Sequence, residues 1–154
     1  MRFTSIKSNG KRVHLEWTTP AEKDPDAQVA HTLESKQPPA PEFTAALQAF
    51  RGEVGTLLEL PKSWMEQVNV TGLSINYEDD GRQGLIVTFT RPLDRTNSPV
   101  LVNTPHLREA SDEETGCYLP DAMIELLKEV EIHAAAYVDG TRAQGELFSE
   151  AKAE

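Results

Sequence analysis

Apolar and polar residues alternate with period two near the start of the chain, the pattern of a half-buried β-strand. Val13, Leu15 and Trp17 lie on one side of this alternation. An Asn-Gly dipeptide at residues 9–10 precedes them, and both residue types adopt positive φ angles at low cost. The first 18 residues are therefore predicted to form a β-hairpin.

Residues 19–41 show no comparable periodicity and contain five prolines. Proline lacks a backbone N–H and disfavours both helix interiors and central strands. We expect this segment to be a long connection with at most one short helical turn.

Helical periodicity follows, with one apolar stripe made of Phe43, Ala46, Leu47, Phe50, Val54, Leu57 and Leu58. Pro41 suits the first turn of a helix, and the Leu60-Pro61 pair should end it. The pattern predicts one helix from Pro41 to Leu60.

Two further strands are predicted over residues 68–77 and 85–92, joined by an Asp-Gly turn at residues 80–81. The apolar alternation changes phase near Thr71 and Gly72, which a β-bulge with one extra residue would explain. The sequence PVLVN, residues 99–103, would add a short edge strand.

The last periodic segment runs from Pro120 to Asp139 and carries apolar residues at alternating three- and four-residue steps. Gly140 follows where a glycine commonly ends a helix. The chain is thus predicted to be an α+β domain over residues 1–140, with an antiparallel sheet of about four to five strands and two main helices on one face. Residues 141–154 would form a flexible acidic tail.

Composition supports a globular protein of one domain, since the 154 residues are 38% hydrophobic and 26% charged. No apolar run reaches the roughly 18 residues that cross a bilayer, and the N-terminus lacks the apolar segment of a signal peptide. Cys117 is the single cysteine, so no internal disulfide can form. These features predict a cytoplasmic protein with no membrane association.

Negative charge is concentrated in the C-terminal third. Residues 109–154 hold twelve acidic and three basic residues, a net charge of −9, whereas the whole chain has a net charge of −10. Such asymmetry indicates an interaction segment or a solvated tail.

The sequence contains no phosphate-binding loop, dinucleotide fingerprint, nucleophile elbow or paired-cysteine zinc spacing. Its four histidines are far apart in sequence. The adjacent carboxylates of Asp112, Glu113 and Glu114 are more typical of a solvated loop than of a cation site, and Cys117 has no neighbouring base. We expect no enzymatic activity, no cofactor and no bound metal.

Arg2, Lys7, Lys11 and Arg12 are candidate nucleic-acid contacts, because all four lie on the N-terminal hairpin near Trp17. Basic and aromatic side chains on a sheet face can bind single strands. The sequence pI of about 4.9 is opposite to the usual electrostatic signature of such proteins, and so disfavours direct nucleic-acid binding.

The tail contains the sequence QGELF at residues 144–148. It resembles the QL(S/D)LF peptide by which bacterial polymerases and mismatch-repair proteins dock on the β sliding clamp. Gln144, Leu147 and Phe148 match the anchor positions. Glu146 is acidic, like the aspartate that the pattern allows at its third position. Gly145 stands where leucine is usual. The resemblance covers five residues and implies the clamp as a partner.

This resemblance predicts a non-enzymatic adaptor or modulator of DNA replication, repair or recombination that docks on the clamp through its tail. The folded body resembles no family, although its size would suit a phage or prophage accessory protein. Alternatives are an acidic decoy that occupies a DNA-binding protein, and a phage structural or self-assembling subunit. Leu147 and Phe148 could also fold back onto the sheet or pack in a dimer; the oligomeric state and the choice between recruitment and inhibition stay open.

Overall fold

The computed structural model describes residues 1–96, 98–109 and 118–143. Its strands are β1 (Arg2–Ser8), β2 (Val13–Pro20), β3 (Gln28–Ser35), β4 (Asn69–Tyr77), β5 (Gln83–Pro92), β6 (Pro99–Asn103) and β7 (Leu107–Arg108). Its helices are α1 (Pro41–Gln48), α2 (Phe50–Leu57), α3 (Lys62–Met65) and α4 (Asp121–Val138). The fold is α+β, as predicted.

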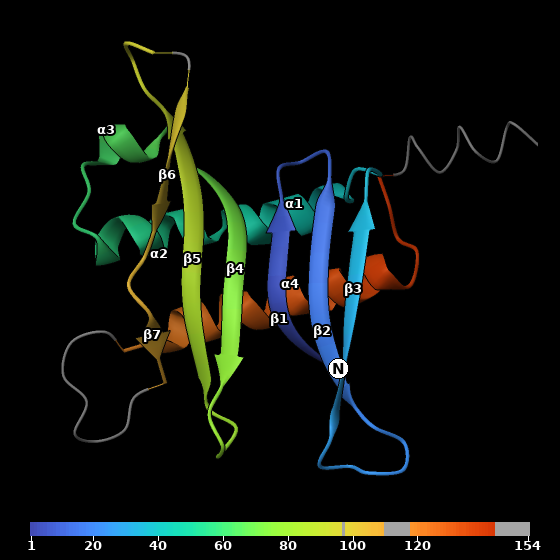
Figure 1. The fold of residues 1–154 in the computed structure, drawn as a ribbon. Coiled ribbons are helices and arrows are strands. Elements are labelled where there is room, and N and C mark those ends of the chain that lie inside the picture. Colours follow the sequence, from blue (N-terminus) through green and yellow to red (C-terminus); the bar gives the residue numbers. More distant parts are fainter. Residues whose placement is uncertain (97, 110–117, 144–154) are drawn as a thin grey trace, which may run out of the picture.

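The strands form one sheet in the order β3-β2-β1-β4-β5-β6, with β7 beside β5, and every pairing between these strands is antiparallel. Helices α1, α2 and α4 cross behind one face of this sheet, and none of the described helices lies on the opposite face (Figure 1). We call the opposite face the open face. The seven strands exceed the four to five expected from the sequence.

The main difference from the predicted fold is the strand β3, which lies where the sequence predicted a long connection over residues 19–41. Its whole length pairs with β2, from Val13 opposite Ser35 to Pro20 opposite Gln28. Inward-facing positions of β3 hold His31, which stacks on the Trp17 ring at a centroid distance of 5.3 Å, and Leu33, which is half-buried. An edge strand buries few side chains, so its alternation in sequence is weak.

The predicted long helix is divided into α1 and α2, which meet at Ala49. The second helix ends at Leu57, earlier than the expected Leu60. Glu59 has a φ angle of 54°, and Leu60 donates its N–H to the carbonyl of Gly55. A left-handed residue therefore ends the helix before the Leu60-Pro61 pair is reached.

The core lies between the sheet and the helices. The apolar positions expected on α4 are all buried: Met123, Leu127, Val130, Ala134 and Tyr137. They pack in the same cluster with Phe43 and Leu47 of α1 and with the inward side chains of β1, β2, β4 and β5. The periodicity of the long elements thus identified most of the core.

The β1–β4 pairing is the shortest in the body of the sheet. Only Ser5, Ile6 and Lys7 of β1 have partners on β4, the last of them Gly72. The register of β4 with β5 shifts between Val70 and Gly72, which confirms the predicted β-bulge. On the N-terminal side of Gly72, at Val70, β4 has no paired strand on the β1 side.

Gln48 of α1 replaces the missing strand at this point. Its Nε2 donates to the Val70 carbonyl at 2.7 Å, and its Oε1 accepts the Val70 N–H at 2.9 Å. Both backbone groups of Val70 would otherwise lack a partner in a residue that is fully buried. One amide side chain therefore satisfies a donor and an acceptor where the ladder is interrupted.

We predict that Gln48→Ala lowers the free energy of unfolding by about 1–3 kcal/mol, because it leaves buried backbone groups of Val70 unsatisfied. Urea denaturation of the two proteins would measure the difference. Gln67→Ala is the matched control, since Gln67 is exposed and its replacement should change stability by less than about 0.5 kcal/mol. Equal stability of the Gln48 and Gln67 variants would contradict the assigned role.

Candidate functional site

The C-terminal end of α4 has the geometry of a Schellman motif. Gly140 has a φ angle of 115°, which favours glycine, and donates its N–H to the Tyr137 carbonyl at 3.1 Å. Thr141 donates its N–H to the Ala136 carbonyl at 3.0 Å. The helix therefore ends at the predicted glycine, and the chain leaves it in a defined direction.

The chain beyond this glycine is attached to the body. The guanidinium of Arg142 lies 3.5 Å from the centre of the Tyr137 ring, and its Nε donates to Oε1 of Gln37 at 2.7 Å. The backbone N–H of Ala143 donates to the Pro38 carbonyl at 3.1 Å. Gln37 and Pro38 follow β3, so the start of the tail is fixed beside the end of that strand.

The predicted clamp anchors, Gln144, Glu146, Leu147 and Phe148, lie outside the described residues. The acidic residues 112–114 and Cys117 lie outside them as well. The interpretation of both segments therefore continues to rest on the sequence.

The structure separates the four basic residues that the sequence placed on one hairpin. Lys7 and Arg12 line a hollow in the open face, and Lys11 lies in the turn between β1 and β2. Arg2 lies at the other end of β1, with its guanidinium 5.0 Å from the centre of the Tyr77 ring. Lys36, which sequence reasoning missed, joins the first two because Val13 pairs with Ser35.

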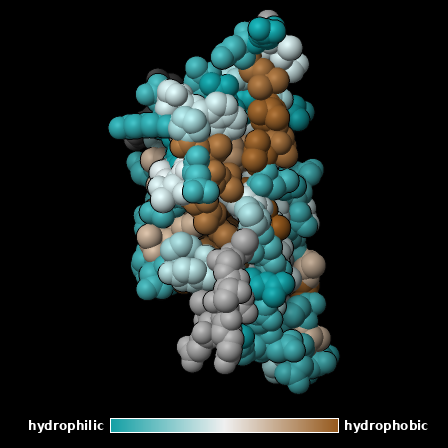
Figure 2. Space-filling model, turned by 90° about the vertical axis from the view of Figure 1, so that its left-hand side faces the viewer, coloured by the Kyte–Doolittle hydropathy of each residue, from teal (hydrophilic) through white to brown (hydrophobic). Residues whose placement is uncertain are grey.

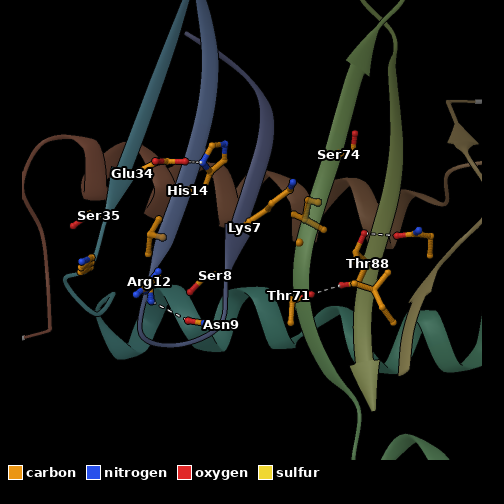
Figure 3. Close-up of a pocket in the computed structure, with 16 residues that line it drawn as sticks. Lys7, Ser8, Asn9, Arg12, His14, Glu34, Ser35, Thr71, Ser74 and Thr88 are labelled. Carbon is orange, nitrogen blue, oxygen red and sulfur yellow. Dashed lines mark hydrogen bonds and ion pairs between the residues drawn. The ribbon is translucent and has the colours of Figure 1, made fainter. Parts of the chain in front are cut away.

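We call this hollow the open-face groove. It has a volume of about 750 Å³ and is lined by Lys7, Ser8, Asn9, Arg12, Val13, His14, Glu34, Ser35, Lys36, Thr71, Gly72, Leu73, Ser74, Thr88, Leu101 and Asn103. These residues come from strands across the sheet and from the β1–β2 turn, and the helices lie behind them (Figure 3). Most of the residues that line it carry polar or charged side chains, and the basic ones lie toward the β1–β2 turn and the end of β3.

His14 is held between two carboxylates on the open face. Its Nε2 lies 2.8 Å from Oε2 of Glu16, and its Nδ1 lies 2.9 Å from Oε1 of Glu34. A neutral imidazole carries one N–H, so only the protonated ring can donate to both carboxylates. The one acidic residue that lines the groove, Glu34, is therefore already engaged by a neighbouring side chain.

Trp17 does not contribute to the open face. Its side chain is 9% exposed, points into the core and lies 6.0 Å from the Phe3 ring between centroids. Among the residues that the structure describes, no phenylalanine, tyrosine or tryptophan lines the groove. The expectation that Trp17 contributes to a nucleic-acid surface is therefore wrong. Two of the four basic residues, Lys7 and Arg12, do lie together on the open face.

A second surface feature is apolar. Hydrophobic side chains form a band on the side of the molecule where β6 is the edge of the sheet (Figure 2). Leu101 of β6 is 61% exposed and Leu93, in the preceding loop, is 43% exposed. This band is suited to contact with another molecule, as exposed apolar patches often are.

A cluster of titratable residues lies on the helix side of the sheet. Burial raises the pKa of the Glu131 carboxyl of α4 above the ordinary value, although the neighbouring side chains of Gln83 and Tyr77 act to lower it. Burial also raises the pKa of Tyr77, whose hydroxyl donates to the Phe3 carbonyl at 3.3 Å. These side chains join α4 to the sheet and do not line the open-face groove.

Comparison of the chain with protein-family models, with curated proteins and with solved structures finds no match. In the ranges that the structure describes, no helix is long and apolar enough to cross a membrane. Those same ranges contain no group of three or more His, Cys, Asp or Glu side chains that could hold a metal ion. The remaining indications of function in the structure are the junction of the tail with the body, at residues 140–143, and the surface features described above.

We predict that Glu131→Gln stabilises the protein at neutral pH by less than about 1 kcal/mol, because the carboxyl remains partly accessible to water. Its raised pKa means that the folded state holds the proton more tightly than the unfolded state. Wild-type stability is therefore lost as the pH rises through the pKa of the folded state, and the variant removes this loss. The difference should vanish below the unfolded pKa.

Thermal denaturation between acidic and neutral pH would test this. Glu125→Gln removes the same charge from an exposed position of the same helix and serves as the control. A stability difference of equal size at every pH would contradict the role given to burial of the Glu131 carboxyl.

Proposed function

We propose that the protein is a non-enzymatic adaptor or modulator of DNA replication, repair or recombination that docks on the bacterial sliding clamp. Residues 144–148 would be the docking peptide, with Gln144, Leu147 and Phe148 as its anchors. The proposal rests on the resemblance of QGELF to clamp-binding peptides.

The observation that best supports this proposal is the position of the motif relative to the body. Ala143 is bound by the Pro38 carbonyl, and the first anchor, Gln144, is the next residue. A peptide that starts from a fixed point loses less conformational freedom on binding than one on a long tether. The body would also be held close to the clamp, where it could exclude or position another protein.

The physical chemistry of the anchors suits such docking. Leu147 and Phe148 would contribute roughly 1.5–3 kcal/mol each if fully desolvated in a preformed pocket. The amide of Gln144 can both donate and accept hydrogen bonds and would set the register of the peptide. Ordering the remaining tail offsets part of this gain, so micromolar affinity is expected.

We predict that a peptide of residues 141–154 binds purified bacterial clamp with a Kd on the order of micromolar, and that the full chain captures the clamp. Leu147→Ala combined with Phe148→Ala should abolish capture by removing both apolar anchors. Gly145→Leu should tighten binding by restoring the usual residue. Isothermal titration and co-sedimentation would measure these effects.

The control is Ser149→Ala with Glu150→Ala, which changes the same segment outside the anchors. If Leu147 and Phe148 instead fold back, their replacement lowers the melting temperature because two buried side chains are lost. Leu147 is four residues and Phe148 five residues from Ala143, so their backbones could then lie at most about 14 Å and about 18 Å from it. Absence of clamp binding by the wild-type peptide at high micromolar concentration would refute the proposal.

The acidic decoy is a second candidate, supported by the arrangement of charge on α4. Asp121, Glu125 and Glu129 are exposed and follow each other at four-residue steps, roughly 6 Å apart along the helix axis. Such a row could imitate the phosphates of a nucleic acid. Capture of a basic DNA-binding protein should then weaken steeply with salt, and salt-insensitive capture would exclude this reading.

The apolar band beside β6 supports the third candidate, a self-assembling subunit. Leu101 and Leu93 lie on or next to an edge strand, and such edges readily pair with another chain. This reading predicts oligomers whose mass depends on concentration and which Leu101→Lys disrupts. Sedimentation velocity would measure this, and a monomer at high concentration would exclude the reading.

A further inference from the structure

The open-face groove is basic in a protein that is acidic overall. Three basic residues line it, Lys7, Arg12 and Lys36, against one acidic residue, Glu34. None of the three forms an ion pair with a carboxylate of the described residues. All three are exposed, so their charges are available to a ligand.

The negative charge of the described chain is partly carried by α4, which lies on the other side of the sheet (Figure 1). Salt largely screens interactions between exposed charges that are more than about 8 Å apart at physiological ionic strength. Glu34, the acidic residue of the groove itself, is engaged by His14 at 2.9 Å. An anion in the groove is therefore exposed mainly to the three nearby cations.

The centre of the groove lies over the β1–β4 pairing, where Gly72 keeps the floor low. A Cβ atom at this position would lie 3.3 Å from Cγ of Lys7 and 3.8 Å from Cβ of Thr88. The stem of Lys7 therefore extends toward β4 beside a residue without a side chain, and its ammonium remains at the groove (Figure 3). A bulkier residue would narrow the groove at its centre.

The other half of the groove offers neutral hydrogen-bonding groups. Thr88 donates its hydroxyl to Oδ1 of Asn103 at 2.5 Å, which leaves the amide Nδ2 of Asn103 for a ligand. Neither this Nδ2 nor the Ser74 hydroxyl donates to another of the described residues. Amide and hydroxyl groups of this kind contact phosphate and sugar oxygens in protein–DNA complexes.

We propose that the open-face groove binds the sugar–phosphate backbone of single-stranded DNA. Lys7, Arg12 and Lys36 pair with phosphates, and Ser74 and Asn103 donate to neighbouring oxygens. The groove crosses from β3 to β6, about 24 Å at ordinary strand spacing, which is longer than one phosphate group needs. A flexible strand can follow a hollow in a sheet, whereas a duplex is stiff over about 150 base pairs.

The lining favours DNA over an acidic peptide. Peptides that bind sheets add a strand at a free edge and place alternate side chains in pockets. The groove lies instead on the face of paired strands, whose backbone groups are used in the ladder, and Leu101 is its one exposed large apolar residue. With no phenylalanine, tyrosine or tryptophan among the described residues of the lining, binding should be independent of base sequence and modest in affinity.

Fluorescence anisotropy of the full chain with labelled oligothymidylate of about 15 nucleotides tests the proposal, the length being that of a typical single-strand site. At physiological salt we expect a Kd of roughly 10⁻⁵ to 10⁻⁴ M, as for other non-specific complexes. Three phosphate contacts predict that log K falls with log salt with a slope of about −2.

The combined variant Lys7→Gln, Arg12→Gln and Lys36→Gln should weaken binding at least about tenfold, since each cation releases counterions from the strand. The matched control, Lys23→Gln, Lys62→Gln and Arg95→Gln, removes the same charge from exposed positions outside the groove and should change affinity less than about twofold. Glu34→Gln, which removes the acidic residue of the groove, should strengthen binding. Circular dichroism would verify that each variant is folded.

Absence of binding by the wild type, equal losses in the two triple variants, or a slope near zero would overturn the proposal. Equal affinity for duplex DNA, or equal competition by polyglutamate, would overturn the assignment to single strands. The inference does not depend on clamp docking, because Leu147→Ala with Phe148→Ala should leave DNA binding unchanged. Loss of DNA binding in that variant would contradict the assignment to the groove.

Discussion

The short pairing between β1 and β4 is the constraint around which the structure is organised. Six of the strands form two units, β1 to β3 and β4 to β6, and the ladder between these units consists only of the pairs that Ser5, Ile6 and Lys7 form with β4. So short a ladder cannot hold two halves of a sheet by hydrogen bonds alone. Helices α1, α2 and α4 pack behind both halves, and their buried side chains join the two units through one core (Figure 1).

The same constraint explains the local irregularities. Because β1 does not continue alongside Val70, β4 has a bulge there and Gln48 of α1 satisfies the exposed backbone groups. Arg91 has a comparable role at the end of β5. It is 8% exposed, donates from Nε to the Trp64 carbonyl at 3.0 Å, and lies 4.8 Å from the centre of the Trp64 ring. It thus joins β5 to α3 through a carbonyl and an aromatic ring.

The open face and the tail junction are close to each other in the fold. Lys36 lines the groove and is followed directly by Gln37 and Pro38, which hold the Arg142 side chain and the Ala143 backbone. A protein bound through the tail would therefore place the basic end of the groove near its partner. The two proposals are therefore physically compatible, although each depends on different residues.

Strong local patterns allowed much of the fold to be predicted. The hairpin turn at residues 9–10, the bulge near Thr71, the buried stripe of α4 and the helix end at Gly140 each depend on residues adjacent in sequence. The strand β3 and the break at Ala49 were missed. An edge strand is stabilised mainly by backbone pairing with a distant segment, and backbone groups are the same in every sequence.

The candidate sites likewise include features that the sequence shows and features that only the fold creates. By itself, the sequence determined the tail motif, the acidic C-terminal third and the basic character of the N-terminal hairpin. Only the tertiary structure decided that Lys36 lies with Lys7 and Arg12, that Arg2 lies apart, and that Trp17 is buried. The reason is physical: strand register brings Lys36 next to Arg12 across 24 residues of chain, and the direction of each side chain depends on which face of the sheet the helices cover.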